Sequence, residues 1–567
     1  MKAFLRSPKS FPRFVVALSA LTTAACVGIT GCSTDSEPSK DAPPSAGETI
    51  FTHVHYKDQA DLQGLVHRYD VLEEVNGEEG WVAVLIDDPA DYEALVASGH
   101  RVDIVERESK QQRLRLQSTA AATGIPGYSC YRTVEETHAA LKQLASDYPN
   151  LAKVVNIGPT WNKQNRDAGY DMLVLALTNS AIAGPKPAFF LMGGIHAREY
   201  TTSETVLRFA EQMAKGYGSD PDATWLLDHY ELHVLPQTNP DSRKVAEQGY
   251  YQRKNANDTN GGSCSVPPTL SNQYGTDLNR NSSFQFNTGG SSDEQCDQDY
   301  HGPSAKSEPE TDNVQKYIAS IFPDQRGPNT GDAAPLDASG VLITLHSYAQ
   351  KVLYPWGWSA SAPPNAAQLA TLGRKFGYLN GYTACQVAAP GCMYVASGGT
   401  DDWSYGELGV ASFTIEMGTA FFEKCSTYEQ SVAPGNLSAL RYAFKAARRP
   451  YQTPSGPESL QVTASPASVS AGASVTLTAT ADDTRYKGSE PTQTIAAAHY
   501  TVDAPSWASN ATSAMDAADG AFDAKSEKLT ATVDTTGWTS GRHIVFVESQ
   551  DAKGNWGVPS SVFIDVP

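Results

Sequence analysis

Four residues able to bind a metal ion or to move a proton stand at or just beyond the ends of apolar runs: His196, Glu199, His346 and Glu416. The runs, 188–192, 341–345 and 411–415, are short, and the first is unbroken, as in strands buried on both faces of an α/β sheet. Imidazole and carboxylate groups are the usual ligands of catalytic zinc, which takes three protein ligands and keeps a fourth position for water. We therefore expect one Zn²⁺ ion to be bound by His196, Glu199 and His346, with Glu416 left as a general base.

The elements around these residues explain how side chains so far apart in sequence would meet. Helical patterns such as 131–148 and 437–447 separate the apolar runs, and this alternation predicts a mixed α/β sheet. Open α/β sheets bind their ligands at the carboxyl ends of the strands. A surface loop would explain one such residue equally well, but three separate buried strand ends seldom each need a charged or metal-binding group.

Composition and the first residues indicate an exported protein. The net charge of −20 over 567 residues argues against nucleic acid as a partner, because phosphate binding needs a basic face. Residues 1–32 combine a basic head, an apolar core and Gly31-Cys32, so we expect a signal peptide whose end resembles a bacterial lipobox. Cys32 would then carry a lipid; the alternative is ordinary cleavage nearby and full release. The protein would be secreted or lipid-anchored at the bacterial cell envelope, with membrane contact only through that anchor.

Changes of composition predict five further segments. Residues 33–49 form a Ser/Pro-rich tether, and 50–108 a small α/β unit. A Gln- and Arg-rich linker, 109–123, is the kind of segment that proteases cut. The candidate ligands fall in 124–453. Short Thr/Val-rich alternating runs then indicate an immunoglobulin-like β-sandwich at 458–567, which could bind another protein or a surface.

Several motifs between about 131 and 447 occur in an order known from one family. They are His196-Ala197-Arg198-Glu199, His346-Ser347-Tyr348-Ala349-Gln350 and Phe413-Thr414-Ile415-Glu416. This part of the chain resembles the zinc carboxypeptidases of the carboxypeptidase A/B type. The resemblance implies a mixed, mostly parallel eight-stranded sheet with helices on both faces. It also implies zinc-dependent hydrolysis of the C-terminal peptide bond of peptides and proteins.

The resemblance also assigns roles to individual residues. Asn279 and Arg280 would hold the terminal carboxylate of the substrate, a task that suits a planar guanidinium. Asp277 would orient the first zinc histidine, and Arg253 would stabilise the oxyanion. Two further residues match accessory positions of the family. Tyr394 would close over the end of the substrate, and Arg198 would contribute to a neighbouring subsite.

A second implication concerns specificity. Asp401 stands just before Asp402-Trp403, at the position that in the family forms the base of the pocket for the C-terminal side chain. A buried carboxylate there needs a cationic partner, so we expect a preference for Lys or Arg ends, or a mixed preference if Asp401 pairs locally. The other matching pocket positions are small or short: Gly357, Ala389, Ala396 and Thr414.

Six cysteines beyond Cys32 suggest disulfides in an exported protein, with fifteen possible pairings. The resemblance implies Cys264–Cys296, which flank the Asn279-Arg280 element. Elimination and proximity then favour Cys385–Cys392 and Cys130–Cys425.

Three alternatives remain open at this point. The chain could be a cell-wall peptide carboxypeptidase of the same fold, although the set Asn279, Arg280 and Tyr394 argues against it. It could be a non-catalytic binding protein, although all four catalytic-centre residues are present. Residues 50–108 have the position of the family's inhibitory propeptide but could be a permanent accessory domain.

Overall fold

The computed structural model describes residues 42–109, 113, 123–260, 262–509 and 511–567. The expected signal peptide with Cys32, most of the tether and most of the linker lie outside the described residues. Within the described part of the chain, the structure contains no helix with the length and hydrophobicity needed to cross a membrane. Residues 43–567 form one compact unit, and the three portions described below belong to it.

An eight-stranded sheet forms the centre of the fold, in the order β11-β10-β12-β9-β7-β8-β6-β5. The pairs β11–β10, β12–β9, β9–β7 and β7–β8 are parallel and the other three are antiparallel. This confirms the mixed, mostly parallel sheet. The strands are β5 (Ala152–Pro159), β6 (Asp171–Leu177), β7 (Ala188–Met192), β8 (Glu231–Leu235), β9 (Val341–His346), β10 (Lys351–Tyr354), β11 (Thr383–Gln386) and β12 (Ala411–Glu416).

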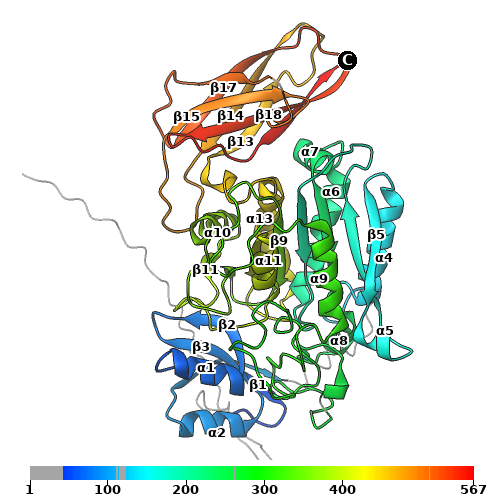
Figure 1. The fold of residues 1–567 in the computed structure, drawn as a ribbon, viewed down its shortest axis with the longest axis vertical. Helices are drawn as coiled ribbons and strands as arrows, with labels where there is room; N and C mark the ends of the chain where they lie inside the picture. The colour runs from blue at the N-terminus through cyan, green and yellow to red at the C-terminus, as the bar shows by residue number, and fades with distance from the viewer. Residues whose placement is uncertain (1–41, 110–112, 114–122, 261, 510) are drawn as a thin grey trace, which may run out of the picture. The chain divides into compact units, whose positions relative to one another are not determined.

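Helices cover both faces of this sheet (Figure 1). Phe189 of β7 packs on Phe209 and Phe444, whereas the next residue, Phe190, packs on Tyr317. Because successive side chains of a strand point to opposite faces, the helices carrying these partners lie on opposite sides. The helices are α4 (Val134–Asp147), α5 (Trp161–Asn165), α6 (Tyr200–Gly216), α7 (Pro221–His229), α8 (Pro240–Ala246), α9 (Pro309–Ile321), α10 (Ala366–Asn380), α11 (Thr400–Leu408), α12 (Cys425–Thr427) and α13 (Ala433–Ala446).

The N-terminal unit is a four-stranded antiparallel sheet, ordered β2-β3-β1-β4, with two helices. Its first strand begins at Glu48, slightly inside the segment expected as tether. The apolar core of the unit continues into the central domain, where it includes Leu353, Val387 and Tyr394. The elements are β1 (Glu48–His55), α1 (Gln59–Arg68), β2 (Asp70–Asn76), β3 (Trp81–Ile86), α2 (Pro89–Ala97) and β4 (Val102–Ser109).

The C-terminal portion is all β, as expected. Seven strands run in the order β13-β14-β17-β16-β15-β18-β19, and every pair is antiparallel. Two backbone hydrogen bonds join the segment after β13 to β19, from Val469 N–H to the Asp565 carbonyl and from Asp565 N–H to the Ala467 carbonyl, which gives a nearly closed sandwich. The strands are β13 (Glu458–Ser465), β14 (Ser474–Asp482), β15 (Ile495–Val502), β16 (Ser513–Ala517), β17 (Ser526–Asp534), β18 (Gly541–Asp551) and β19 (Ser560–Val566).

Candidate metal centre and substrate cleft

Two glycines form the turn that leads from β7 into the first metal motif. Gly194 has φ +65°, and a Cβ there would lie 2.7 Å from the Ser203 hydroxyl, so only glycine fits. A Cβ on Gly193 would lie 2.9 Å from the backbone of Thr202. The chain can therefore pass tightly against the start of α6. That close passage positions the loop carrying His196 and Glu199 at the carboxyl end of β7.

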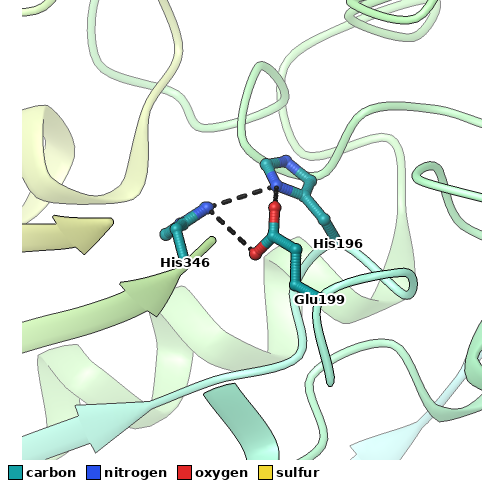
Figure 2. Close-up of side chains that lie close together, drawn as sticks. All are labelled: His196, Glu199 and His346. Carbon is teal, nitrogen blue, oxygen red and sulfur yellow. Dashed lines mark hydrogen bonds and ion pairs between the residues drawn. The ribbon is translucent and has the colours of Figure 1, made fainter. Parts of the chain in front are cut away.

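The three predicted ligands converge at this point (Figure 2). His196 Nδ1 lies 2.6 Å from Glu199 Oε1, and His346 Nδ1 lies 3.2 Å from His196 Nδ1 and 3.5 Å from Glu199 Oε2. All three side chains are buried. The second Glu199 oxygen, Oε2, is buried without a hydrogen-bond partner among the described residues.

This donor set fits a zinc ion. Burial lowers the pKa of His196 and lowers that of His346 to about 4, so both imidazoles are neutral, which is the form that binds metal. Two neutral imidazole nitrogens and one carboxylate match the three protein ligands of a hydrolytic zinc site. A cation among them would also satisfy the buried Glu199 oxygen.

Asp277 connects the metal ligands to the substrate cleft. Its Oδ1 lies 3.1 Å from His196 Nε2, and its Oδ2 accepts hydrogen bonds from Arg253 Nε at 3.1 Å and Nη2 at 2.9 Å. Burial raises the pKa of Asp277, but attraction to Arg253 and His196 outweighs it and holds the pKa well below its ordinary value. An ionised carboxylate on the second ring nitrogen fixes the orientation of a ligand histidine. Asp277 thus orients both His196 and Arg253.

Glu416 ends β12 beside the third ligand. In the parallel pairing of β12 with β9, Glu416 is opposite His346. Its Oε2 atom is buried and has no hydrogen-bond partner among the described residues. Burial, together with Glu73 and Glu199, raises the pKa of Glu416 well above its ordinary value. A buried carboxyl group with one unpaired oxygen, on the strand beside the third ligand, is placed to exchange a proton with a nearby water molecule.

A small cavity of about 40 Å³ adjoins this centre. Asp401 lies in its wall, where its carboxylate accepts hydrogen bonds from the Thr414 hydroxyl at 3.1 Å and from the Asp402 amide at 2.9 Å. Ala389 was expected here but lines a neighbouring hollow instead, because it belongs to the turn closed by Cys385 and Cys392. The lining residues are Glu73, Asn279, Arg280, His346, Leu353, Gly357, Val387, Met393, Ala396, Gly399, Asp401, Thr414 and Glu416.

The two candidate carboxylate-binding residues lie side by side in this wall. The side-chain oxygen of Asn279 accepts a hydrogen bond from the Thr400 backbone N–H at 3.1 Å, and the Asn279 backbone N–H donates to Asp277 Oδ1 at 2.9 Å. Arg280 is buried; its Nε and Nη1 atoms donate to the carbonyls of Gly290 and Asn279, and Nη1 also lies 4.0 Å from Asp277 Oδ2. Its two hydrogen bonds thus go to neutral carbonyls, and the guanidinium lines the cavity where an anionic ligand could reach it.

The N-terminal unit covers the cleft, which sequence patterns did not reveal. Asp70 accepts two hydrogen bonds from Arg198, at 2.7 and 3.0 Å, and both side chains are buried. Glu73 Oε1 lies 3.5 Å from Arg253 Nη1. Tyr394 is also buried, in the core shared with that unit. In the intact chain, these substrate-side residues therefore contact the N-terminal unit.

Three disulfides connect the cysteines in the favoured pairs: Cys130–Cys425, Cys264–Cys296 and Cys385–Cys392. The second closes the long loop that carries Asp277, Asn279 and Arg280. The first joins the segment before α4 to α12.

Comparisons with known proteins agree with this geometry. The family model described as zinc carboxypeptidase matches residues 137–431. Carboxypeptidase A2 of Mus musculus is 32% identical over 323 residues, which cover 56% of this chain and 69% of that protein. Carboxypeptidase A2 of Rattus norvegicus is 33% identical over 304 residues, 52% of this chain and 64% of that protein. The structure of carboxypeptidase A from Helicoverpa armigera has the same fold, with a TM-score of 0.57 and 22% identity over 71% of this chain and 98% of that chain. The chain therefore belongs to the zinc carboxypeptidase family.

Proposed function

We propose that this metallocarboxypeptidase removes single C-terminal residues from peptides and proteins outside the cell, and that residues 48–109 inhibit it until they are released. The observation that carries the proposal is the meeting of the His196, Glu199 and His346 ligands with Glu416, Arg253 and a cavity that Asp401 lines. A metal centre, a base and an adjoining cavity lined by Asn279 and Arg280 suit the cutting of a terminal bond.

In the proposed mechanism, bound zinc supplies a Lewis acid that polarises a carbonyl and makes a water molecule more acidic. Glu416 takes the proton of the attacking water and passes it to the departing amine. Arg253, held by two hydrogen bonds to Asp277, donates to the carbonyl oxygen as its negative charge develops. Because Asp277 also contacts His196, its carboxylate fixes the position of Arg253 relative to the first metal ligand.

Exopeptidase specificity would come from Asn279 and Arg280. Both line the cavity beside Glu416, so a substrate carboxylate bound there leaves the last peptide bond near the base. Tyr394 would close over the substrate end once the N-terminal unit no longer packs on it. Arg198 would serve a neighbouring subsite after Asp70 departs.

The preference for the C-terminal side chain is proposed from Asp401. Gly357, Ala396 and Thr414 line the same cavity, and each has a short side chain or none. Burial raises the pKa of Asp401, and a substrate guanidinium or ammonium would stabilise its ionised form. The Thr414 hydroxyl and the Asp402 amide each donate to one oxygen of Asp401, so a mixed preference is the alternative to a Lys or Arg preference.

The test uses the full chain after limited trypsin cleavage, with peptides ending in Arg, Lys, Phe or Leu and their C-terminal amides. We expect stepwise loss of residues from the free acids, fastest for Arg and Lys, and none from the amides. Equal cutting of the amides would overturn the carboxypeptidase assignment. A preference of about tenfold for Phe over Arg would overturn only the role of Asp401.

Export and activation follow from the same proposal. The basic and apolar first residues would direct secretion, with Cys32 either lipidated or removed. Cleavage between about 110 and 122 would separate the inhibitory unit from the cleft that it covers. If the uncut chain hydrolyses peptides as fast as the cut chain, the N-terminal unit is an accessory domain.

A further inference from the structure

One cation of the cleft has no role in the mechanism above. Lys351 begins β10 and is paired in the sheet with Glu416. Paired residues of neighbouring strands project to the same face, so Lys351 emerges beside the general base. Within the part of the chain that the structure describes, no carboxylate forms an ion pair with its Nζ atom.

Only backbone carbonyls hold this ammonium group. Its Nζ donates to the Glu73 carbonyl at 3.1 Å, to the Val75 carbonyl at 3.3 Å and to the Cys392 carbonyl. Burial lowers the pKa of Lys351 to about 8, against the attraction of Glu416, Glu74 and Glu73. Two of the three acceptors belong to the N-terminal unit. When that unit leaves, Lys351 becomes a cation at the cleft with most of its partners gone.

The segment that covers Lys351 is strongly acidic. Residues 73–79 contain four glutamates, and residues 74–78 line a hollow of about 770 Å³ together with Lys351 and the 385–392 turn. Along β2 and the turn after it, Asp70 meets Arg198, Glu73 meets Arg253, and Glu74 is near Lys351. The N-terminal unit thus places an acidic side chain near each of three cationic side chains of the cleft.

The position of Lys351 indicates which part of a substrate it would contact. Leu353 and Gly357, further along the same strand and loop, line the cavity for the C-terminal side chain. Lys351 is paired with Glu416 in the sheet and lines the other hollow together with Ala349 and the 385–392 turn. The rest of that wall, residues 74–78 and Trp81, belongs to the N-terminal unit, so release of the unit leaves this hollow open beside Glu416. Since Glu416 would act at the scissile bond and the cavity takes the released residue, the opened hollow is left for the residues that precede that bond.

We propose that Lys351 is a specificity-determining residue that selects substrates with a carboxylate side chain upstream of the scissile bond. The inference depends on the proposed carboxypeptidase function and extends it to the substrate residues that are not released. The pair is formed in a partly open hollow, so its strength matches that of a moderately screened ion pair. We expect kcat/KM to be about 5-fold higher for Glu than for Gln at the best upstream position.

The experiment compares matched peptides with Glu or Gln at each of the three positions before the same C-terminal residue, using the trypsin-cut full chain. The Glu/Gln ratio should fall toward one in Lys351→Met, remain in Lys351→Arg, and decrease with added salt because the pair is ionic. Lys316→Met, which removes an exposed lysine of α9, should keep the wild-type ratio.

The outcomes separate the two proposals. Equal cleavage of Glu and Gln peptides by the wild type, or an unchanged ratio in Lys351→Met, would overturn the role of Lys351 while leaving the carboxypeptidase function intact. No cleavage of either peptide would overturn the proposed function itself. If Lys351→Met does not fold, the Glu/Gln ratio of the wild type and its dependence on salt still test the role of Lys351.

Discussion

The contact between Asp70 and Arg198 gives a quantitative prediction about inhibition. In the intact chain the guanidinium is 1% exposed, the carboxylate is 2% exposed, and two hydrogen bonds join them. Asp70→Ala leaves a buried, unpaired guanidinium over the Phe421 ring. Removing one partner of a buried pair costs about 3–5 kcal/mol. Once the unit has undocked, Arg198 is hydrated, so the cost falls on the docked state alone.

Even the lower figure changes the docking equilibrium by about 150-fold. The uncut Asp70→Ala chain should therefore hydrolyse peptides about 10²-fold faster than the uncut wild type, with the cut enzyme as the upper limit. The assay is initial-rate hydrolysis before and after trypsin. Asp103→Ala is the matched control, because it removes a partly exposed carboxylate that pairs with Arg101 and His55 of the same unit. An uncut variant as slow as the uncut wild type, with both activated by trypsin, would refute the reasoning.

Three further changes test the site and the stability of the fold. Glu416→Gln should keep bound zinc, measured by metal analysis, but lose about 10²–10⁴-fold in kcat, and near-normal turnover would contradict its role. Asp401→Ala should lower kcat/KM for Arg-ended peptides by a factor equivalent to about 2–4 kcal/mol of transition-state stabilisation. Leu-ended peptides should lose less, and an equal loss for both peptides would indicate a structural role. Burial raises the pKa of Glu310 to about 8, so the folded chain keeps a proton that the unfolded chain releases above about pH 4.5. Stability should then fall as pH rises from about 4.5 to about 8, and Glu310→Gln should flatten that fall in urea unfolding; an unchanged slope would show that Glu310 is ionised in the fold.

The site of the central domain was predictable because its candidate metal-binding and catalytic residues lie at the ends of strands. The runs before His346 and Glu416 are buried on both faces, and a parallel register then brings the two residues opposite each other. Gly193 and Gly194 mark the turn into the first motif for a steric reason that a sequence can signal. For these positions, the local pattern and the global fold require the same residues.

The contacts of the N-terminal unit were not predictable in this way. Asp70 and Arg198 are 128 residues apart, and nothing in the spacing of Asp70 distinguishes it from a surface residue of a strand. The strand β1 and the helix α1 also lack a clear hydrophobic pattern in the sequence. The strand β1 is central in its small sheet and mixes buried and partly exposed positions. Docking depends on the shape of both partners, so only the structure shows that Glu73 and Lys351 meet across it.

The central claim is that zinc held by His196, Glu199 and His346 drives removal of C-terminal residues. The most direct measurement is mass spectrometry of a defined peptide mixture incubated with the trypsin-cut protein, with and without a zinc chelator. The account predicts ladders shortened from the C-terminus, their loss on chelation and their return when zinc is added back. Ladders that persist unchanged after the zinc has been removed, or cleavage at internal bonds instead of the C-terminal end, would contradict it.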